Sequence, residues 1–299
     1  MKKIVLSTIV ALAATSAFAQ SNVEIYGKMR IYQESYKAGT SSSVTQQTSD
    51  ASRLGFKGTE DLGGGLKAFF VLETALANDA PTATTLGDRT SKVGLSTDVG
   101  SFSMGRDKHS VGLLADRYDA MQNFLGTSVG TIHSLQGYRV QNAVFVTASP
   151  VKNVTVSYQN SSSETAGVSN TQAGGVDVTF GNLSASYARY DNQAGNVSDA
   201  VGAKFNLEST GSTIFAMYSD NTISGVESKG KSIGINQKLG SNLMALASYG
   251  EKTGTRAYNA GLNYSLSKRT TLLARYAKEN ADNNANDLQR IGLGIEHNF

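Results

Sequence analysis

The sequence predicts an all-β protein, a 16-stranded antiparallel transmembrane β-barrel, on three observations. Apolar and polar residues alternate with a period of two along segments of roughly ten residues. The connections between these segments alternate between short turns and longer polar loops. Beyond the N-terminal segment, no stretch approaches about 18 consecutive apolar residues, so a membrane-spanning helix is not expected.

The N-terminal segment has the layout of a secretory signal peptide. Two lysines precede an apolar run from Ile4 to Phe18, and small residues mark a cleavage position after Ala19. An uncleaved N-terminal anchor is the alternative, which the shortness of the run disfavours. We therefore expect residues 1–19 to be removed and residues 20–299 to form one barrel domain.

The composition favours strands and narrows the classes of partner. Two of the 27 basic residues belong to the predicted leader, which leaves 25 against 24 acidic residues. Such a nearly neutral chain gives no reason to expect nucleic-acid binding. The sequence has no Cys, so it offers no disulfide and no thiolate metal ligand. High Gly and Tyr with only 2 Pro favours extended segments.

The alternation is clearest at the C-terminus. Ile291, Leu293 and Ile295 share one face of an extended segment, while Arg290 and Glu296 lie on the other. A water-soluble β-sandwich would also alternate, but with shorter strands and a more heavily charged polar face. Other segments with the same pattern are 23–31, 154–159, 183–188 and 259–264.

The connections indicate the number of strands. Seven short turns and eight longer loops imply about sixteen strands, an even number that places both termini on the periplasmic side. The turns are predicted at 60–64, 98–100, 149–152, 181–182, 207–211, 238–242 and 266–269. The loops are predicted at 36–50, 76–88, 108–138, 161–173, 191–197, 219–228, 251–255 and 279–287.

Closure of the sheet follows from the needs of the backbone. An unpaired amide or carbonyl is costly in hydrocarbon, so the first and last strands must pair. With about sixteen strands the interior is too wide for side chains to fill, and water occupies it. Aromatic residues near strand ends are expected to form interfacial girdles, with Tyr26 and Tyr32 instead towards the lumen or rim.

One stretch closely resembles a known family. The run Ser52–Glu73 (SRLGFKGTEDLGGGLKAFFVLE) is similar to the second and third strands of Gram-negative trimeric porins of the neisserial and β-proteobacterial type. The chain is short for that family, and its third loop shares little beyond its opening. Further matches are Val93–Leu95, Gly105-Arg106, Arg139–Pro150, Ser267–Thr270 and the terminal Phe299.

The resemblance implies a homotrimer in the outer membrane, in contact with outer-membrane lipid. Each barrel would hold its own channel for passive diffusion of small hydrophilic solutes and ions. The third loop, 108–138, would fold into the lumen and narrow it. The length of this connection points the same way, since a long loop in a compact fold is usually functional or disordered.

The face that carries the charges predicts a modest anion preference. Charges that faced lipid would be strongly unfavourable, so their restriction to one parity marks that face as wet. It carries ten basic residues: Lys28, Arg30, Arg53, Lys57, Lys67, Lys92, Arg139, Lys204, Arg275 and Arg290. The acidic residues on it are five: Glu24, Glu73, Asp107, Asp177 and Glu296.

Two arginines, Arg53 and Arg139, lie in stretches that match the family, where the resemblance implies a basic cluster facing acids of the third loop. Opposed charges would set a transverse electric field that favours polar solutes over apolar ones of equal size. The predicted basic side of the constriction also includes Lys28, Arg30 and Lys92. The predicted acidic side is Asp107, Asp116 and Asp119.

Other functions fit the sequence less well. An enzyme is not expected, because the His-Ser neighbours at 109–110 and 133–134 would point to opposite faces of a strand. The three His show no metal-ligand spacing, and no cofactor motif is present. The closer alternative is a channel of the same fold that selects a particular anion or organic acid. A surface adhesin would need larger loops.

Overall fold

The computed structural model describes residues 22–77, 85–122, 128–135, 138–282 and 287–299; the predicted signal peptide lies outside them. The described part of the chain is built mainly of strands, with two helices between β6 and β7. The strands are β1 (Asn22–Ala38), β2 (Val44–Ser49), β3 (Arg53–Gly63), β4 (Leu66–Ala75), β5 (Thr90–Thr97), β6 (Gly100–Lys108), β7 (Arg139–Val151), β8 (Val154–Ser161), β9 (Thr171–Phe180), β10 (Leu183–Asp191), β11 (Val197–Leu207), β12 (Ser212–Ile223), β13 (Val226–Lys238), β14 (Leu243–Lys252), β15 (Thr255–Ser265), β16 (Thr270–Ala281) and β17 (Leu288–Asn298). The helices are α2 (Ser110–Tyr118) and α3 (Ser128–His133).

Sixteen strands cross the barrel wall, because β2 and β3 are two parts of one strand. Both pair antiparallel with β1, β3 along Asn22–Lys28 and β2 along Ile31–Tyr36. The break falls between them, where Ala51 has a positive φ of 53°. The predicted 16-stranded antiparallel barrel is confirmed.

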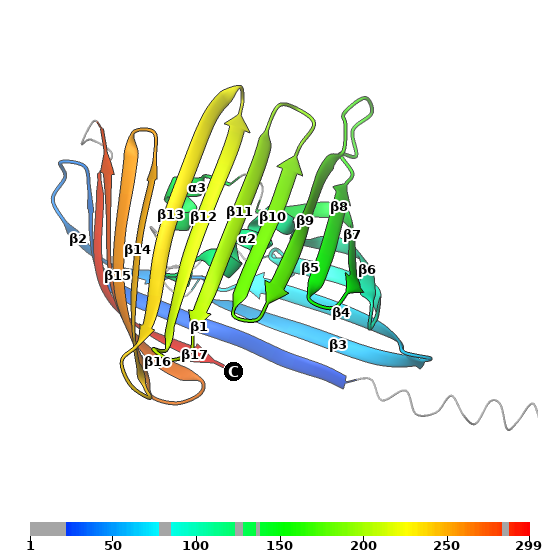
Figure 1. The fold of residues 1–299 in the computed structure, drawn as a ribbon, viewed down its shortest axis with the longest axis horizontal. Coiled ribbons are helices and arrows are strands. Elements are labelled where there is room, and N and C mark those ends of the chain that lie inside the picture. The colour runs from blue at the N-terminus through cyan, green and yellow to red at the C-terminus, as the bar shows by residue number, and fades with distance from the viewer. Residues whose placement is uncertain (1–21, 78–84, 123–127, 136–137, 283–286) are drawn as a thin grey trace, which may run out of the picture.

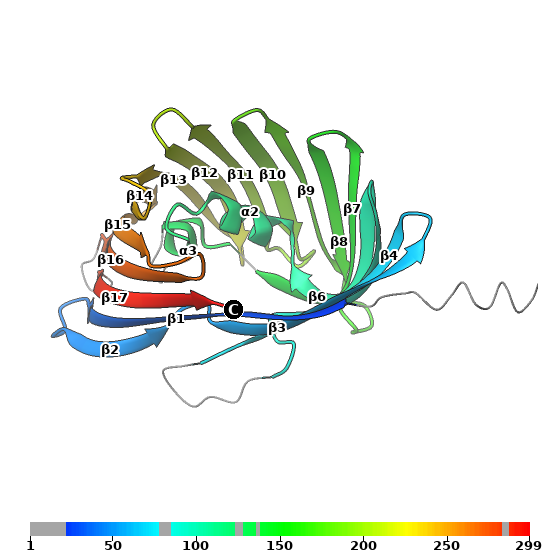
Figure 2. The same ribbon diagram turned by 90° about the horizontal axis from the view of Figure 1, so that it is seen from below.

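β1 and β17 close the ring. Their antiparallel register runs from Lys28 opposite Asn298 to Ala38 opposite Leu288. Just beyond it, the amide of Gly27 donates to the carbonyl of Phe299 over 3.0 Å, and the reverse bond measures 3.1 Å. Figures 1 and 2 show the two strands side by side. The pairing leaves neither terminal strand as an open edge there, as the hydrocarbon environment demands.

The two faces of the wall differ as the alternation predicts. On β1, Val23 and Ile25 are exposed, whereas Lys28 and Arg30 are buried. On β17, Leu293 is 70% exposed. Apolar side chains thus point outward, which suits a wall that contacts lipid and is the reverse of a water-soluble protein. The outward, exposed aromatic residues include Phe70, Phe102, Tyr158, Phe180, Tyr187, Tyr218, Tyr258, Tyr264 and Phe299.

The seven predicted short turns all connect neighbouring strands, but several loops are shorter than predicted. β2 lies inside the predicted loop 36–50, and the loops 219–228 and 251–255 reduce to the two-residue turns Ser224-Gly225 and Thr253-Gly254. Both residues of the first turn have positive φ, as a tight hairpin requires. Polar composition did not predict the ends of these strands, because polar segments that extend beyond the membrane still pair their backbones as strands.

The third loop occupies 109–138 between β6 and β7 and contains both helices. α2 packs mainly against β9, β10 and β11, and α3 packs against β12 to β15. The contacts are on the polar face of these strands, and Figure 2 shows both helices within the ring. Neither helix is long and apolar enough to cross a membrane, and the same holds for every helix in the described residues.

The closure of the barrel between β1 and β17 depends on Gly27, which has no side chain. A Cβ on Gly27 would lie 2.4 Å from the ring of Phe299 and 2.7 Å from the carbonyl oxygen of Arg53. We predict that Gly27→Val lowers the unfolding free energy by about 1–3 kcal/mol, because the strands must separate to admit it. The measurement is urea unfolding of refolded protein in detergent.

The matched control is Gly240→Val, since Gly240 lies in a turn with no atom within 4 Å of its Cβ position. Equal unfolding midpoints for Gly27→Val and Gly240→Val would contradict the prediction.

Candidate functional site

A belt of charged side chains runs along the inner wall from β16 through β17 and β1 to β7. We call this set the charged belt. It holds seven cations and four carboxylates, so its formal charge is positive. Its members are Arg275, Glu296, Lys28, Arg30, Asp50, Arg53, Glu73, Arg89, Lys92, Asp107 and Arg139.

The part of the belt on β3 to β6 faces water. Glu73 of β4 forms ion pairs with two arginines, Arg53 with an N···O distance of 3.5 Å and Arg89 with one of 2.6 Å. Lys92 of β5 lies 2.5 Å from Asp107 of β6. Arg53 and Lys92 keep 31% and 23% of their side-chain surface exposed. These cations can therefore meet a passing solute.

Arg139 completes this side at the start of β7. Its guanidinium lies 5.6 Å from the ring of Tyr138, and the residue is half-buried. Glu73, Asp107 and Arg89 all lie close enough to act on its charge. The structure thus brings together Arg53, Lys92, Asp107 and Arg139, which the sequence analysis proposed as one constriction.

The part of the belt on β1 and β17 is more deeply buried. Arg30 contacts Glu296 at 2.5 Å and Asp50 at 3.0 Å, and donates to the carbonyl oxygen of Gln122 in the third loop over 2.8 Å. Lys28 lies 3.6 Å from Glu296. Arg30 is only 5% exposed, so its charge anchors the loop to the wall more than it contacts solute.

The break between β2 and β3 builds this buried part. Ser52 bonds to both backbone groups of Arg30, accepting from its amide at 2.9 Å and donating to its carbonyl at 3.1 Å. The left-handed backbone at Ala51 turns Asp50 towards the Arg30 guanidinium. One interrupted strand therefore supplies a carboxylate that an unbroken ladder would place elsewhere.

The third loop covers the opposite side of the ring. The ring of Tyr118 lies where a side chain on Gly202 would be, and the carbonyl of Ile132 lies 2.6 Å from the Cβ position of Gly230. Ala120 has the same relation to Gly234, with its Cβ at 2.4 Å. Apolar residues of α2, including Val111 and Leu114, join Phe145, Tyr190 and Met217 of the wall in one cluster. The loop is thus packed closely against β8 to β15.

The predicted acids of the loop have different surroundings. Asp116 of α2 forms an ion pair with Lys108 and lies close enough to Arg139 of β7 to act on its charge. Asp119 is 5% exposed, and its carboxylate accepts from the amide of Met121 at 2.9 Å, which shapes the turn after α2. Asp116 and Asp107 are the acids placed to act on the lumen.

Sequence reasoning missed two members of the belt. Arg89 and Asp50 lie beside or within predicted loops, where alternation gives no face. A signal for Asp50 was present, because an inward cation at position 30 on β1 needs a carboxylate across the ladder. The sequence held no such signal for Arg89, because the position of its side chain depends on the path of the connection that precedes β5.

Two buried histidines hold the third loop. His109 precedes α2, where its ring accepts from the amide of Gly112 over 3.4 Å and stacks on Tyr190 at 4.6 Å. His133 ends α3 with its ring nitrogens 2.8 Å from the Ser219 hydroxyl and 2.9 Å from the Ser232 hydroxyl. Both side chains are 0% exposed, which keeps them from any solute.

Within the ranges that the structure describes, no three His, Asp or Glu side chains are grouped as a metal site would need. Ser110, the neighbour of His109, directs its hydroxyl to the amide oxygen of Gln159 at 2.7 Å. This serine and its histidine are thus both engaged in packing the loop.

A closed barrel with an apolar outer face and a charged, water-facing inner face defines an integral outer-membrane β-barrel. The Gram-negative porin family matches residues 6–285, and the chain belongs to this family. The family assignment also confirms the resemblance seen in the run Ser52–Glu73 and the location in the outer membrane.

Two curated relatives match part of the chain. Outer membrane porin protein 32 of Delftia acidovorans is 36% identical over 141 residues, which cover 44% of this chain and 38% of that protein. Major outer membrane protein P.IB of Neisseria gonorrhoeae is 36% identical over 113 residues, 35% of this chain and 32% of that protein. The matched stretches thus span about a third of these relatives.

Among solved structures, the anion-selective porin from Comamonas acidovorans is similar over nearly the whole fold. The TM-score is 0.80 at 22% sequence identity, with 94% of this chain and 100% of that chain covered. At this identity, the likeness establishes the fold.

The environment of His133 predicts a pH effect on stability. Burial, with repulsion from Lys252, lowers the pKa of His133 from 6.5 to about 4. Because the unfolded chain takes up the proton first, the stabilisation is complete above about pH 6.5 and declines as the pH falls towards 4. The expected loss is on the order of 3 kcal/mol.

The comparison is with His133→Gln, which cannot titrate. We expect the difference in unfolding free energy between wild type and His133→Gln to shrink between pH 6.5 and 4, as measured by urea unfolding at several pH values. Parallel pH profiles for the two proteins would show that the ring of His133 does not titrate in this way.

Proposed function

We propose that this porin is a channel for passive diffusion of small hydrophilic solutes and ions, with a modest preference for anions. The observation that carries the proposal is the group of water-facing cations Arg53, Arg89, Lys92 and Arg139 on β3 to β7. They stand on the side of the ring that the helices of the third loop leave uncovered.

In this proposal, the third loop narrows the lumen and the cations line the remaining passage. Each water-facing cation attracts anions, while Glu73 and Asp107 hold the cations in place. Asp116, on the loop side, adds charge of the opposite sign and so a field across the passage. That field orders water and disfavours apolar solutes of equal size.

Arginine suits the passage because its charge persists at every physiological pH. Its planar guanidinium can also engage a carboxylate or phosphate through two hydrogen bonds. No solute needs to stay bound for this mechanism, which agrees with a polar wall rather than an apolar pocket.

We also propose a homotrimer, the assembly implied by the family resemblance, which cross-linking in detergent would test.

A channel selective for a particular organic anion is the second candidate. It is favoured by a hollow of about 500 Å³ below α2, where Arg117 and Lys204 lie among the hydroxyls of Thr155, Ser184 and Ser186. Arg117 already pairs with Asp177, so Lys204 is the main charge that the hollow offers to a solute.

The water-facing arginines should set the ion selectivity of the channel. We expect Arg53→Ala with Arg139→Ala to lower the anion-to-cation permeability ratio about fivefold, because a unit charge some ~4 Å from an ion in water contributes about 1 kcal/mol. Loss of Arg53 also leaves the negative charge of Glu73 less fully balanced by neighbouring cations. The measurement is the reversal potential across a salt gradient in planar bilayers.

Arg189→Ala is the control for that measurement, since Arg189 lies on the outer wall, where it pairs with Asp199 at 2.6 Å. An unchanged reversal potential in the double variant would remove the constriction from the proposal and leave the barrel intact.

A second measurement separates the two kinds of channel. For a general channel, we expect conductance to scale with bulk salt and small carboxylates to cause no saturable block. Current block that saturates with one organic acid, and that Lys204→Gln abolishes, would favour the selective channel.

A further inference from the structure

A second charged surface lies on the outer wall, at the end of β12 to β16 opposite to the short turns. Successive outward rows can be followed across these strands from the ladder register. One row contains Ile235, Ala247 and Ala260, and the next contains Ile233, Tyr249 and Tyr258. The wall thus changes from aliphatic to aromatic residues, as barrels do where hydrocarbon meets headgroups.

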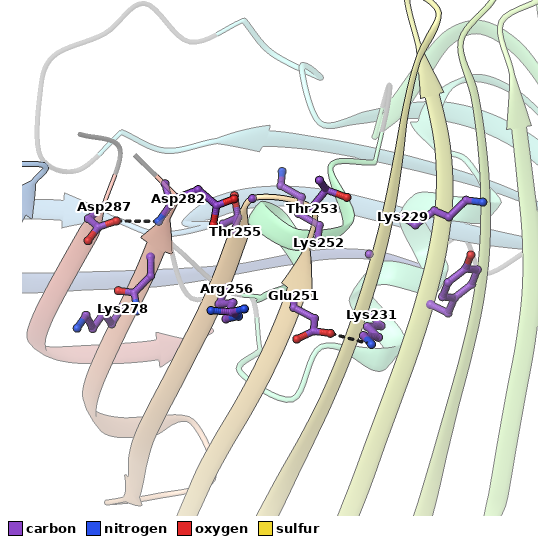
Figure 3. Close-up of a pocket in the computed structure, with 15 residues that line it drawn as sticks. Lys229, Lys231, Glu251, Lys252, Thr253, Thr255, Arg256, Lys278, Asp282 and Asp287 are labelled. Atoms are coloured by element: carbon purple, nitrogen blue, oxygen red, sulfur yellow. Dashed lines mark hydrogen bonds and ion pairs between the residues drawn. The ribbon is translucent and has the colours of Figure 1, made fainter. Parts of the chain in front are cut away.

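The following row is charged. Lys231 lies opposite Glu251, and Glu251 lies opposite Arg256. Two residues of strand separate this row from the tyrosines, which is about 7 Å. Lys278 of β16 lies opposite Tyr258, one row lower. The four side chains therefore stand at headgroup depth, and Figure 3 shows them on neighbouring strands of the wall, with the helices behind it.

The charges of this surface do not balance. Lys231 pairs with Glu251 at 2.7 Å, and Lys229 pairs with Asp220 at 3.4 Å. Arg256 and Lys278 are exposed, and neither has a carboxylate within 4 Å in the described part of the chain. Two cations are left over, side by side on neighbouring strands.

The surface is also hollowed. A recess of about 830 Å³ is lined by these residues and by the low turn between β14 and β15. Two more carboxylates, Asp282 and Asp287, lie at the rim above the row, where Asp287 accepts from the amide of Ala281 at 2.7 Å. The recess is large enough for a headgroup, and its membrane side is cationic.

On another face of the wall, the outward row that follows a tyrosine has a different charge. On β10 and β11, Arg189 lies 2.6 Å from Asp199 and 3.7 Å from Asp191, so two carboxylates meet one cation. The charge beyond the tyrosines therefore differs between these two faces of the wall.

We propose that Arg256 and Lys278 bind a phosphate of the phosphorylated glycolipid in the outer leaflet. The tyrosine pair Tyr249–Tyr258, with ring centroids 5.2 Å apart, lies where the sugar and the first acyl carbons would rest. Arginine can grip a phosphate through two hydrogen bonds, and lysine adds a second positive charge. The lipid headgroup fits better than free phosphate because both cations lie beside the aromatic row.

The test is binding of bisphosphorylated lipopolysaccharide to purified, detergent-folded protein, measured by thermophoresis. We expect R256Q with K278Q to weaken binding about 30-fold, which is about 2 kcal/mol at 1.4 kcal/mol per tenfold change. R189Q, which lies one outward row beyond Tyr187 on another face of the wall, should bind as wild type does. The charge-preserving pair R256K with K278R should retain most of the affinity.

Two further arms identify the ligand. Enzymatic removal of the lipid phosphates should weaken wild-type binding to the level of the double variant. An excess of inorganic phosphate should not displace the lipid more than sodium chloride of equal ionic strength does, because both screen the charges equally. Equal affinity of wild type and R256Q with K278Q, or displacement by inorganic phosphate, would overturn the proposal. Circular dichroism and heat-dependent electrophoretic mobility establish that every variant is folded.

Discussion

Every feature of this protein depends on the need to pair backbone amides and carbonyls in a medium that offers no water. Sixteen strands meet that need only as a ring, and the pairing of β1 with β17 completes it. Once the ring is closed, side-chain alternation assigns one face to lipid and one to the interior. The charged residues are then confined to the interior and the rims, where they are available to act on solutes.

The ring is too wide for its own side chains to fill, and the third loop takes up part of the space. Its apolar residues pack on the wall at β7 and at β9 to β12, and Met121 joins Tyr32 and Leu246 in a second cluster. Hydrophobic packing in this barrel therefore lies between loop and wall. The side from β3 to β6, with Arg139 at the start of β7, stays polar, which divides the interior into a packed side and a side that faces water.

Much of this organisation could be predicted from the sequence. The succession of short turns and longer loops predicted sixteen strands, and the alternation of side chains predicted their faces, since a period of two follows directly from strand geometry. It failed where the backbone departs from a regular ladder, as at the break beside Asp50 and in the connection before Arg89. The helix α2 did leave a signal in the spacing of Val111, Leu114, Ala115 and Tyr118, which suits one helical face.

The close fit between loop and wall has an evolutionary consequence. Gly202 of β11 and Gly230 and Gly234 of β13 leave three hollows in the wall, and each is filled by one part of the third loop. If the third loop of a related barrel replaced this one, its side chains would not fit these hollows. Conversely, this loop would clash with a wall that carried alanine in place of the three glycines. Natural variation in pore lining must then proceed by paired changes in two distant stretches, or by altering the uncovered cations alone.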